Sequence, residues 1–191
     1  MGDAGGEGGG TVPPEGDGLN ALAWFRRSAL HAANGRDADA VRCADRALSL
    51  DPSLRAARWN RGVCLLRLGR WREAWPDWES GIGIGAREQR PWPQRWGGVS
   101  SVVGKRVYLW GEQGLGDTIM CLRFVAPFRE RFRPGRVIVE VQPSLVRIAQ
   151  GLAGADEVVC KRARHEPATA FDVHASLYSL PAFLGVSPED V

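Results

Sequence analysis

The sequence predicts a mixed fold, in which helical hairpins come first and an α/β parallel-sheet domain follows. Apolar residues recur with a helical period from about residue 20 to 81, and small residues repeat within that segment. After Lys105, short runs rich in β-branched and aromatic residues alternate with helical stretches. A Gly- and Pro-rich segment at 82–104 separates the two patterns and is expected to be a connector.

The first 18 residues are expected to be a disordered tail. They read MGDAGGEGGGTVPPEGDG, and their Gly, Pro and acidic residues bury too little apolar surface to offset the entropy of ordering. The tail lacks the basic start and apolar core of a secretory signal. No apolar segment approaches the roughly 18 residues needed to cross a bilayer. We therefore expect no membrane span and a cytoplasmic location.

The composition argues against several kinds of partner and site. The formal net charge is only +3, and nearly all of the positive charge is Arg. Without clustering on one face or a recognition motif, this balance makes nucleic-acid binding unlikely. The four cysteines lie far apart and form no Cys-x-x-Cys pair, so we expect neither a metal site nor a disulfide framework, and instead buried thiols.

The first helix pair has recognisable ends. The first helix should run from about Ala21 to Ala33 and stop at Asn34-Gly35, because Gly suits the backbone that follows a helix. The second should begin at Asp37, whose carboxylate is expected to cap the first amides.

The second helix pair is expected to start and end in a similar way. Ser53 is predicted to cap the third helix, and Pro76 should kink the fourth helix or end it early. Trp71, Trp75 and Trp78 follow i, i+4 and i+7 spacing on the fourth helix. Such a stripe is more often core than ligand site, and it is also a candidate seam to the second domain.

The two helix pairs are related by an internal repeat. An offset of 34 residues superposes small residues on one another: Ser28 on Gly62, Gly35 on Gly69 and Ala40 on Ala74. This period, with Pro52 closing the first unit, resembles the tetratricopeptide repeat (TPR). The resemblance implies two TPR units over residues 19–81 and binding of a protein or peptide through their helices.

Residues 105–191 are expected to form a Rossmann-like half-domain. Four strands are predicted at 106–110, 136–141, 156–160 and 171–175, with helical stretches at 117–131 and about 143–152 between them. Strands that alternate with helices through short loops imply right-handed βαβ units and a parallel sheet.

The loop GEQGLGD at 111–117 is the first candidate site, because sites in open parallel sheets form at the carboxyl ends of strands. It lacks the Lys of a phosphate-binding P-loop and the dinucleotide fingerprint, and Asp117 would occupy the positive helix end. Glycines permit close approach, and Asp117 can accept a proton or hydrogen bond from a sugar hydroxyl. The alternative stays open that Asp117 is an ordinary helix cap in an ordinary turn.

Three segments carry a second resemblance: the string from Gly111 to Ile119, the Trp96-Gly97 pair and FDVHASLYSLP at 171–181. Together they resemble bacterial TPR-linked glycosyltransferase-like proteins, which are similar to the lipopolysaccharide heptosyltransferases with two facing Rossmann-like domains. The resemblance implies that Asp117 is the catalytic base that deprotonates a sugar-bearing acceptor. The substrate-binding residues would be those of the loop: Gly111, Glu112, Gln113, Gly114 and Gly116. Glu112 and Gln113 have no role in the resemblance itself, and we expect them to hydrogen-bond the acceptor.

In these enzymes the nucleotide-sugar donor is held mainly by a C-terminal domain. The sequence stops at Val191, so we expect the acceptor-side half of a transferase, without a donor-binding domain, without a cofactor of its own, and incomplete or inactive alone. The alternative function is a TPR protein-interaction module with a non-catalytic α/β scaffold.

Overall fold

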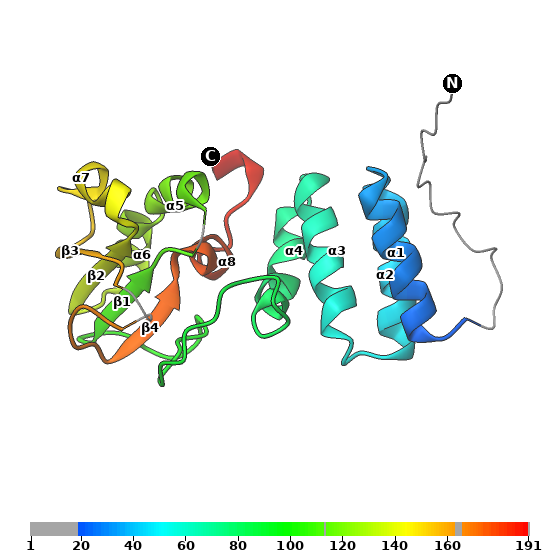
Figure 1. Ribbon diagram of the computed structural model, residues 1–191, viewed down its shortest axis with the longest axis horizontal. Helices are drawn as coiled ribbons and strands as arrows, with labels where there is room; N and C mark the ends of the chain where they lie inside the picture. The colour runs from blue at the N-terminus through cyan, green and yellow to red at the C-terminus, as the bar shows by residue number, and fades with distance from the viewer. Residues whose placement is uncertain (1–18, 113, 163–165, 191) are drawn as a thin grey trace, which may run out of the picture. The chain divides into compact units, whose positions relative to one another are not determined.

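The computed structural model describes residues 19–112, 114–162 and 166–190 (Figure 1). The expected tail at 1–18 and the predicted site residue Gln113 lie outside these residues. The chain divides into two compact units at the Ser80–Gly81 boundary. The first unit is helical and the second is a parallel sheet with helices, which confirms the predicted fold class. None of the described helices is long and apolar enough to cross a lipid bilayer.

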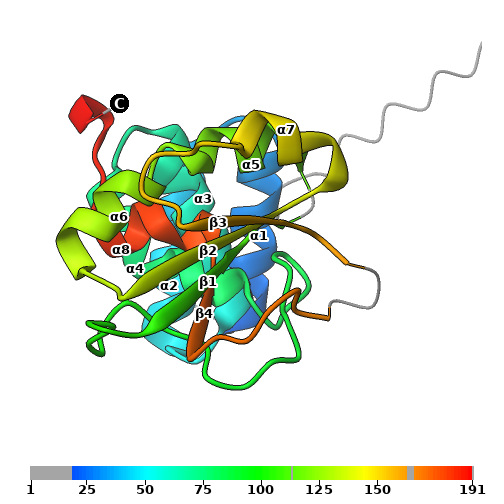
Figure 2. The ribbon, with the colours of Figure 1, turned by 90° about the vertical axis from the view of Figure 1, so that its left-hand side faces the viewer.

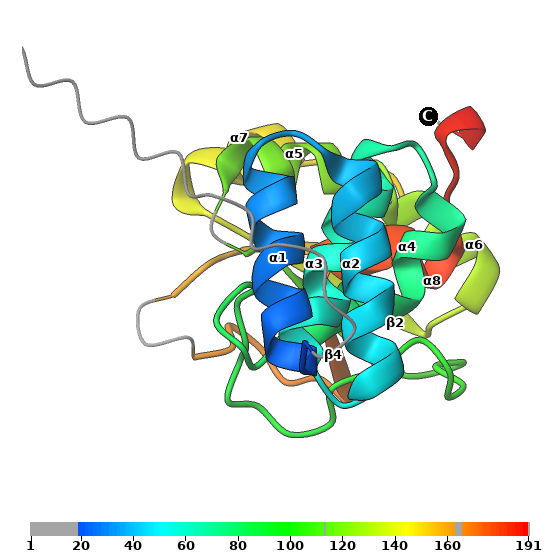
Figure 3. The ribbon, with the colours of Figure 1, turned by 90° about the vertical axis from the view of Figure 1, so that its right-hand side faces the viewer.

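The first unit consists of two helical hairpins (Figures 1 and 3). Its helices are α1 (Ala21–Ala33), α2 (Asp37–Leu50), α3 (Arg55–Arg67) and α4 (Trp71–Trp78). The predicted ends of α1 are confirmed, and Gly35 follows it with φ +69°. The early end predicted for α4 is also confirmed, because Pro76 removes a donor from the helical ladder two residues before the helix stops.

The internal repeat is visible in the turns. Gly69 has φ +75°, close to the +69° of Gly35, and only glycine adopts this left-handed backbone freely. The residue after each glycine donates a 2.9 Å backbone hydrogen bond to an equivalent carbonyl: Arg36 to His31, and Arg70 to Leu65. The same turn therefore closes both hairpins.

Small residues occur where the two helices of each hairpin touch. Ala40 on α2 and Ala74 on α4 are fully buried. In the first hairpin the Ser28 hydroxyl donates to the Ala40 carbonyl at 2.7 Å. In the second hairpin Gly62 takes the place of Ser28, and a Cβ there would lie 3.4 Å from the Ala74 carbonyl oxygen. The two helices of each hairpin therefore touch closely at equivalent positions, which are occupied by Ser28 in the first hairpin and by Gly62 in the second.

The two predicted helix caps are wrong. Asp37 lies inside α2 and pairs with Arg67 at 3.4 Å, while Arg36 occupies the cap position without a side-chain hydrogen bond. Ser53 donates its backbone N–H and its hydroxyl to Asp51, at 2.9 and 2.6 Å. These bonds lower the pKa of the Asp51 carboxyl. A local Asp–Ser turn thus competes with capping and uses the Ser53 hydroxyl.

The tryptophans of α4 are half-buried and not enclosed as core. Trp71, Trp75 and Trp78 keep part of their surface accessible, and Trp78 packs against Trp59 of α3 with ring centroids 4.9 Å apart. The enclosed positions on this helix are instead the smaller Ala74 and Asp77. Small side chains let the helices approach, so the large indoles are left at the margin of the contact. Their role as a seam between domains stays a prediction.

The second unit contains a four-stranded parallel sheet with the order β3-β2-β1-β4 (Figure 2). The strands are β1 (Arg106–Trp110), β2 (Arg136–Val141), β3 (Glu157–Cys160) and β4 (Val173–Ser176), close to the predicted positions. The sheet is covered on both faces, because Val107, Leu109, Val137 and Val139 are fully buried on one face and Tyr108 and Ile138 are enclosed on the other.

Short helices connect the strands or follow the last of them. They are α5 (Leu115–Leu122), α6 (Val125–Phe132), α7 (Val146–Ala149) and α8 (Leu180–Leu184). The stretch predicted as one helix at 117–131 is split, because Pro127 has no N–H to donate to Arg123 and Phe124 bonds back to Cys121 over a tighter turn. The stretch predicted at 143–152 is a 3₁₀ turn, Pro143–Leu145, followed by the single turn of α7.

The connector packs onto the sheet, as expected from its tryptophans. Trp96 is 2% exposed and contacts three phenylalanine rings, with the Phe183 centroid at 4.8 Å. Trp92 packs against Tyr108 of β1 and Phe171 at 5.4 and 5.5 Å. Residues 81–104 therefore belong to the compact α/β unit.

Candidate functional site

The candidate loop lies at the point where the strand order reverses. β2 and β3 extend the sheet on one side of β1, and β4 pairs with β1 on the other side. Ligands of open α/β sheets bind outside the carboxyl ends of two such strands. Here those ends lead into the loop at 111–114 and into the 3₁₀ turn Leu177–Ser179. The candidate loop site therefore includes residues from both β1 and β4.

Asp117 is the accessible acid of this site. It is the third residue of α5, is exposed, and receives no hydrogen bond or ion pair from any residue in the described part of the chain. A Cβ added to Gly114 would collide with its Oδ2 and would lie 3.3 Å from the hydroxyl of Tyr178. The carboxylate of Asp117 and the phenol of Tyr178 thus converge above Gly114, where only glycine fits.

The cap interpretation of Asp117 has no hydrogen bond to support it. Gly114 holds the cap position of α5, and the hydroxyl of Thr118 donates to the Gly114 carbonyl at 2.9 Å. Asp117 is left with a favourable but weak interaction with the helix dipole. Its role as a base is not tested by this geometry and stays a prediction.

Glu112 is occupied by partners within the protein. Its side chain is buried, and its Oε1 accepts from Arg87 at 2.5 Å and from Ser176 at 2.6 Å. Its Oε2 accepts from the backbone N–H of Glu88 at 3.2 Å. The carboxylate therefore joins the loop to the connector and to β4. Binding of an acceptor by this carboxylate would require it to share or exchange these partners.

The glycines of the loop have different surroundings. The N–H of Gly111 donates to the Glu140 carbonyl at 2.9 Å, and a Cβ at residue 111 would lie 3.0 Å from the Thr118 hydroxyl. Gly111 is therefore needed for packing. Gly116 is exposed with open space around it, and it is the loop glycine most accessible to a ligand.

A buried network of charges lies beside the loop. The connector supplies Arg90, which pairs with Glu140 of β2 at 2.6 Å, and both side chains are fully buried. Glu140 also accepts from the Tyr108 hydroxyl at 3.0 Å, and burial raises the pKa of this tyrosine. Lys161 pairs with Glu88 at 3.2 Å. Together with Arg87 and Glu112, the network contains three bases and three acids, so its charges balance.

Sequence analysis missed this network and Tyr178. One signal was present: Glu140 is a carboxylate within the otherwise apolar run VIVEV at 137–141, and a buried charge requires a partner. The charges at 87–90 lie in a segment interpreted only as a connector. Tyr178 follows β4 by two residues, and its proximity to Asp117 depends on strand order.

His174 of β4 is a structural residue. It is 1% exposed, and its Nδ1 accepts a hydrogen bond from the indole N–H of Trp110 at 3.1 Å. Its Nε2 lies 3.2 Å from the Trp92 carbonyl, so the proton is on Nε2. Burial lowers the pKa of His174, which keeps the ring neutral.

Three of the four cysteines are buried, and the expectation of buried thiols is wrong for the fourth. Cys160, the last residue of β3, is exposed because the strand lies at the edge of the sheet. Burial raises the pKa of Cys64 and of Cys121 to about 12, so these thiols are unreactive. Among the described residues, no group of three or more His, Cys, Asp and Glu side chains could hold a metal ion.

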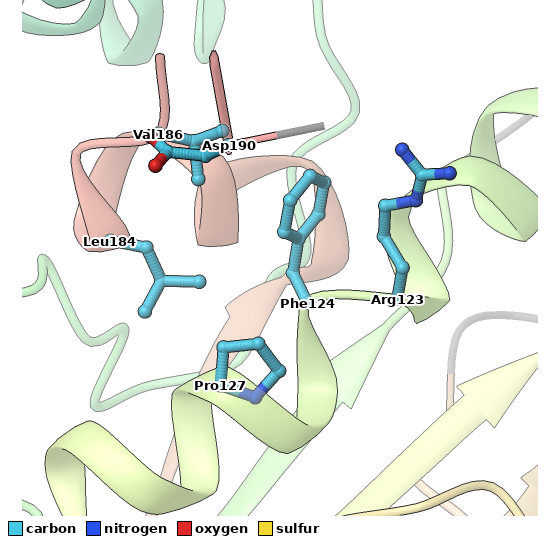
Figure 4. A pocket seen from close by; sticks show the side chains of 6 residues that line it. All are labelled: Arg123, Phe124, Pro127, Leu184, Val186 and Asp190. Atoms are coloured by element: carbon cyan, nitrogen blue, oxygen red, sulfur yellow. The ribbon is translucent and has the colours of Figure 1, made fainter. Parts of the chain in front are cut away.

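A hollow of about 500 Å³ lies elsewhere on the α/β unit (Figure 4). It separates the α5–α6 junction from the segment after α8, and its lining is largely apolar: Arg123, Phe124, Pro127, Leu184, Val186 and Asp190. None of the described loop residues, 111–112 and 114–117, lines it, so it is distinct from the candidate loop site.

A second candidate site lies on the helical unit. α1 and α3 are neighbours, and the Asn60 amide of α3 donates to the Ser28 hydroxyl of α1 at 2.6 Å. Helical spacing places an apolar line beside this contact, with Leu22 46% exposed and three smaller side chains half-buried. We call this surface the α1–α3 face, formed by Leu22, Arg26, Ala29, Ala56, Asn60 and Val63.

Comparison with known proteins identifies the first hairpin. The tetratricopeptide repeat family matches residues 21–54, which contain α1, α2 and the turn between them. No curated protein and no solved structure matches the chain. The resemblance of residues 111–119 to glycosyltransferases thus has no support from a relative, and a second repeat at α3 and α4 stays a prediction. The chain contains a tetratricopeptide repeat, a module that generally mediates contacts between proteins.

Proposed function

We propose that the helical unit binds a segment of another protein through the α1–α3 face. The repeat match supports an interaction module. The observation that carries the assignment to this face is its apolar line, in which the exposed Leu22 of α1 and the half-buried Val63 of α3 lie along two neighbouring helices. Repeat proteins typically bind through a surface to which the same helix of each repeat contributes.

The energetics favour a short apolar segment as the bound element. Full burial of a Leu or Val side chain contributes about 1.5–3 kcal/mol, so two or three such contacts supply about 3–9 kcal/mol toward the roughly 8 kcal/mol of micromolar affinity. Backbone and polar contacts of the partner must supply the rest and offset the cost of association. Ala29 and Ala56 add little apolar area but allow a partner backbone to approach.

The test compares two full-length variants in partner capture. Leu22→Glu with Val63→Glu places charges on the α1–α3 face, and Leu50→Glu places a charge on α2, where Leu50 is 48% exposed. We expect the double variant to bind the captured partner at least about tenfold more weakly, with an unchanged melting temperature. Leu50→Glu should bind normally. Equal binding by the double variant, or equal loss with Leu50→Glu, would contradict the assignment.

A second candidate function concerns the α/β unit. We propose that the loop site positions a hydroxyl of a sugar-bearing acceptor, with Asp117 accepting its hydrogen bond or proton. The observation that favours it is the exposed Asp117 carboxylate, which no described residue engages, beside Tyr178 where the strand order reverses. Glycosyl transfer itself would need a nucleotide-sugar donor bound by a second domain, as in the enzymes that the loop resembles.

Binding of free monosaccharides to the full chain tests this candidate without requiring transfer. Saturation-transfer NMR should show contact with at least one sugar, and Asp117→Asn should remove the signal. Glu130→Gln, which changes an exposed acid on α6, is the matched control. A signal that survives Asp117→Asn would sink this role for the loop.

A further inference from the structure

Charge is distributed unequally between the first and second helices of the two hairpins. α1 and α3 carry six arginines and no acidic residue. α2 and α4 carry three arginines and five carboxylates. The helices that form the α1–α3 face are therefore the basic half of the unit.

Part of this positive charge is neutralised within the unit. Arg61 contacts Asp77 and Asp45, both at 2.7 Å, and is directed away from the face toward α4 and α2. Arg67 pairs with Asp37 at the longer distance of 3.4 Å, and its side chain is 54% exposed.

Arg26 keeps its charge on the face itself. It is exposed on α1, four residues after Leu22 and three before Ala29, so it lies along the same apolar line. No residue in the described part of the chain forms a hydrogen bond or ion pair with its guanidinium. No acidic residue of α1 or α3 opposes it.

We propose that the segment bound by the α1–α3 face is acidic: an apolar stretch flanked by Asp or Glu. This inference rests on the proposed function of the helical unit and specifies its partner by charge. Apolar contact with Leu22 and Val63 supplies affinity, and the positive potential accelerates association with an acidic segment and disfavours a basic one. A nucleic acid fits less well, because an apolar line with few unpaired arginines neutralises few phosphates.

The test uses two synthetic helical peptides with identical apolar positions and either Glu or Lys at the flanking positions. Fluorescence anisotropy with the full chain should show the Glu peptide binding about tenfold more tightly than the Lys peptide, and rising salt should reduce the difference. Arg26→Glu should remove most of the preference. Arg72→Glu is the control, because Arg72 is an exposed arginine on α4 and should leave the preference unchanged.

Several outcomes would overturn the inference. These are equal or tighter binding of the Lys peptide, an unchanged preference in Arg26→Glu, and displacement of the Glu peptide by a single-stranded oligonucleotide at equal concentration. If neither peptide binds while partner capture still depends on Leu22 and Val63, the acidic assignment fails and the proposed function stands. If capture does not depend on those residues, the proposed function itself fails.

Discussion

The helical unit and the α/β unit are held together by contacts of different range. In the helical unit the partly buried Arg61–Asp77 pair joins residues 16 apart, and equivalent turns close both hairpins. In the α/β unit the buried Arg90–Glu140 pair joins residues 50 apart, and the Ser176–Glu112 bond joins residues 64 apart. The comparison teaches that the repeat pattern specifies local geometry, whereas the candidate loop site is assembled from distant segments.

The largest expected effect is in the buried network. Glu140→Ala removes the 2.6 Å partner of the fully buried Arg90, which keeps its longer contact with Glu88 at 3.3 Å, and should cost about 3–5 kcal/mol of unfolding free energy. Glu157→Ala, which breaks the exposed Arg136–Glu157 pair, should cost less than about 1 kcal/mol. Urea unfolding followed by tryptophan fluorescence measures both. Equal costs for the two variants would show that the network does not stabilise this unit in particular.

Helix contact in the second hairpin should be the next most sensitive feature. A Cβ at residue 62 would lie 3.0 Å from the Asp77 Cβ, so Gly62→Leu should overpack α3 against α4 and cost about 1–3 kcal/mol. Gly97→Leu is the control, since nothing lies within 4 Å of a Cβ at that position. Thermal unfolding followed by circular dichroism distinguishes the two. A neutral Gly62→Leu would mean that α3 and α4 are not closely packed at this position.

Acidification provides a smaller effect that separates the two units. Burial lowers the pKa of His174 below the ordinary value of 6.5, so the unfolded chain binds more protons below that pH and stability falls as pH drops. We expect the unfolding free energy of the α/β unit to fall by at most about 1.4 kcal/mol per pH unit from this group, and His174→Gln should reduce that dependence. His31 of α1 is also shifted downward by burial, so His31→Gln should affect only the helical transition. Identical slopes for both variants and the native chain would refute this assignment.

The smallest expected effect on stability is at Asp117. Because no described residue hydrogen-bonds its carboxylate, Asp117→Asn should change the free energy of unfolding by less than about 0.5 kcal/mol. A loss of about 1 kcal/mol or more would instead identify Asp117 as a helix cap. Urea unfolding of the full chain decides between these alternatives, with Glu130→Gln as the reference for an exposed acid.

Much of the fold could be predicted because its signals are local. Helical period and Gly35 located the ends of α1, and β-branched runs located the strands. The two cap predictions, at Asp37 and Ser53, failed because each side chain is taken up by another partner: Asp37 pairs with Arg67, and Ser53 bonds to Asp51. Such competition is not visible in the helix signals alone. Asp117 could be proposed from its loop alone, whereas Tyr178 and the Arg87–Glu112 pair depend on strand order and on the path of the connector.

Hydrogen–deuterium exchange of the full chain, with and without its captured partner, tests the central claim most directly. We predict that the partner slows exchange in α1 and α3, at residues 21–33 and 55–67, and leaves α5 and the loop before it unchanged. Protection confined to residues 111–122, with α1 and α3 unaffected, would contradict the account and assign partner binding to the α/β unit.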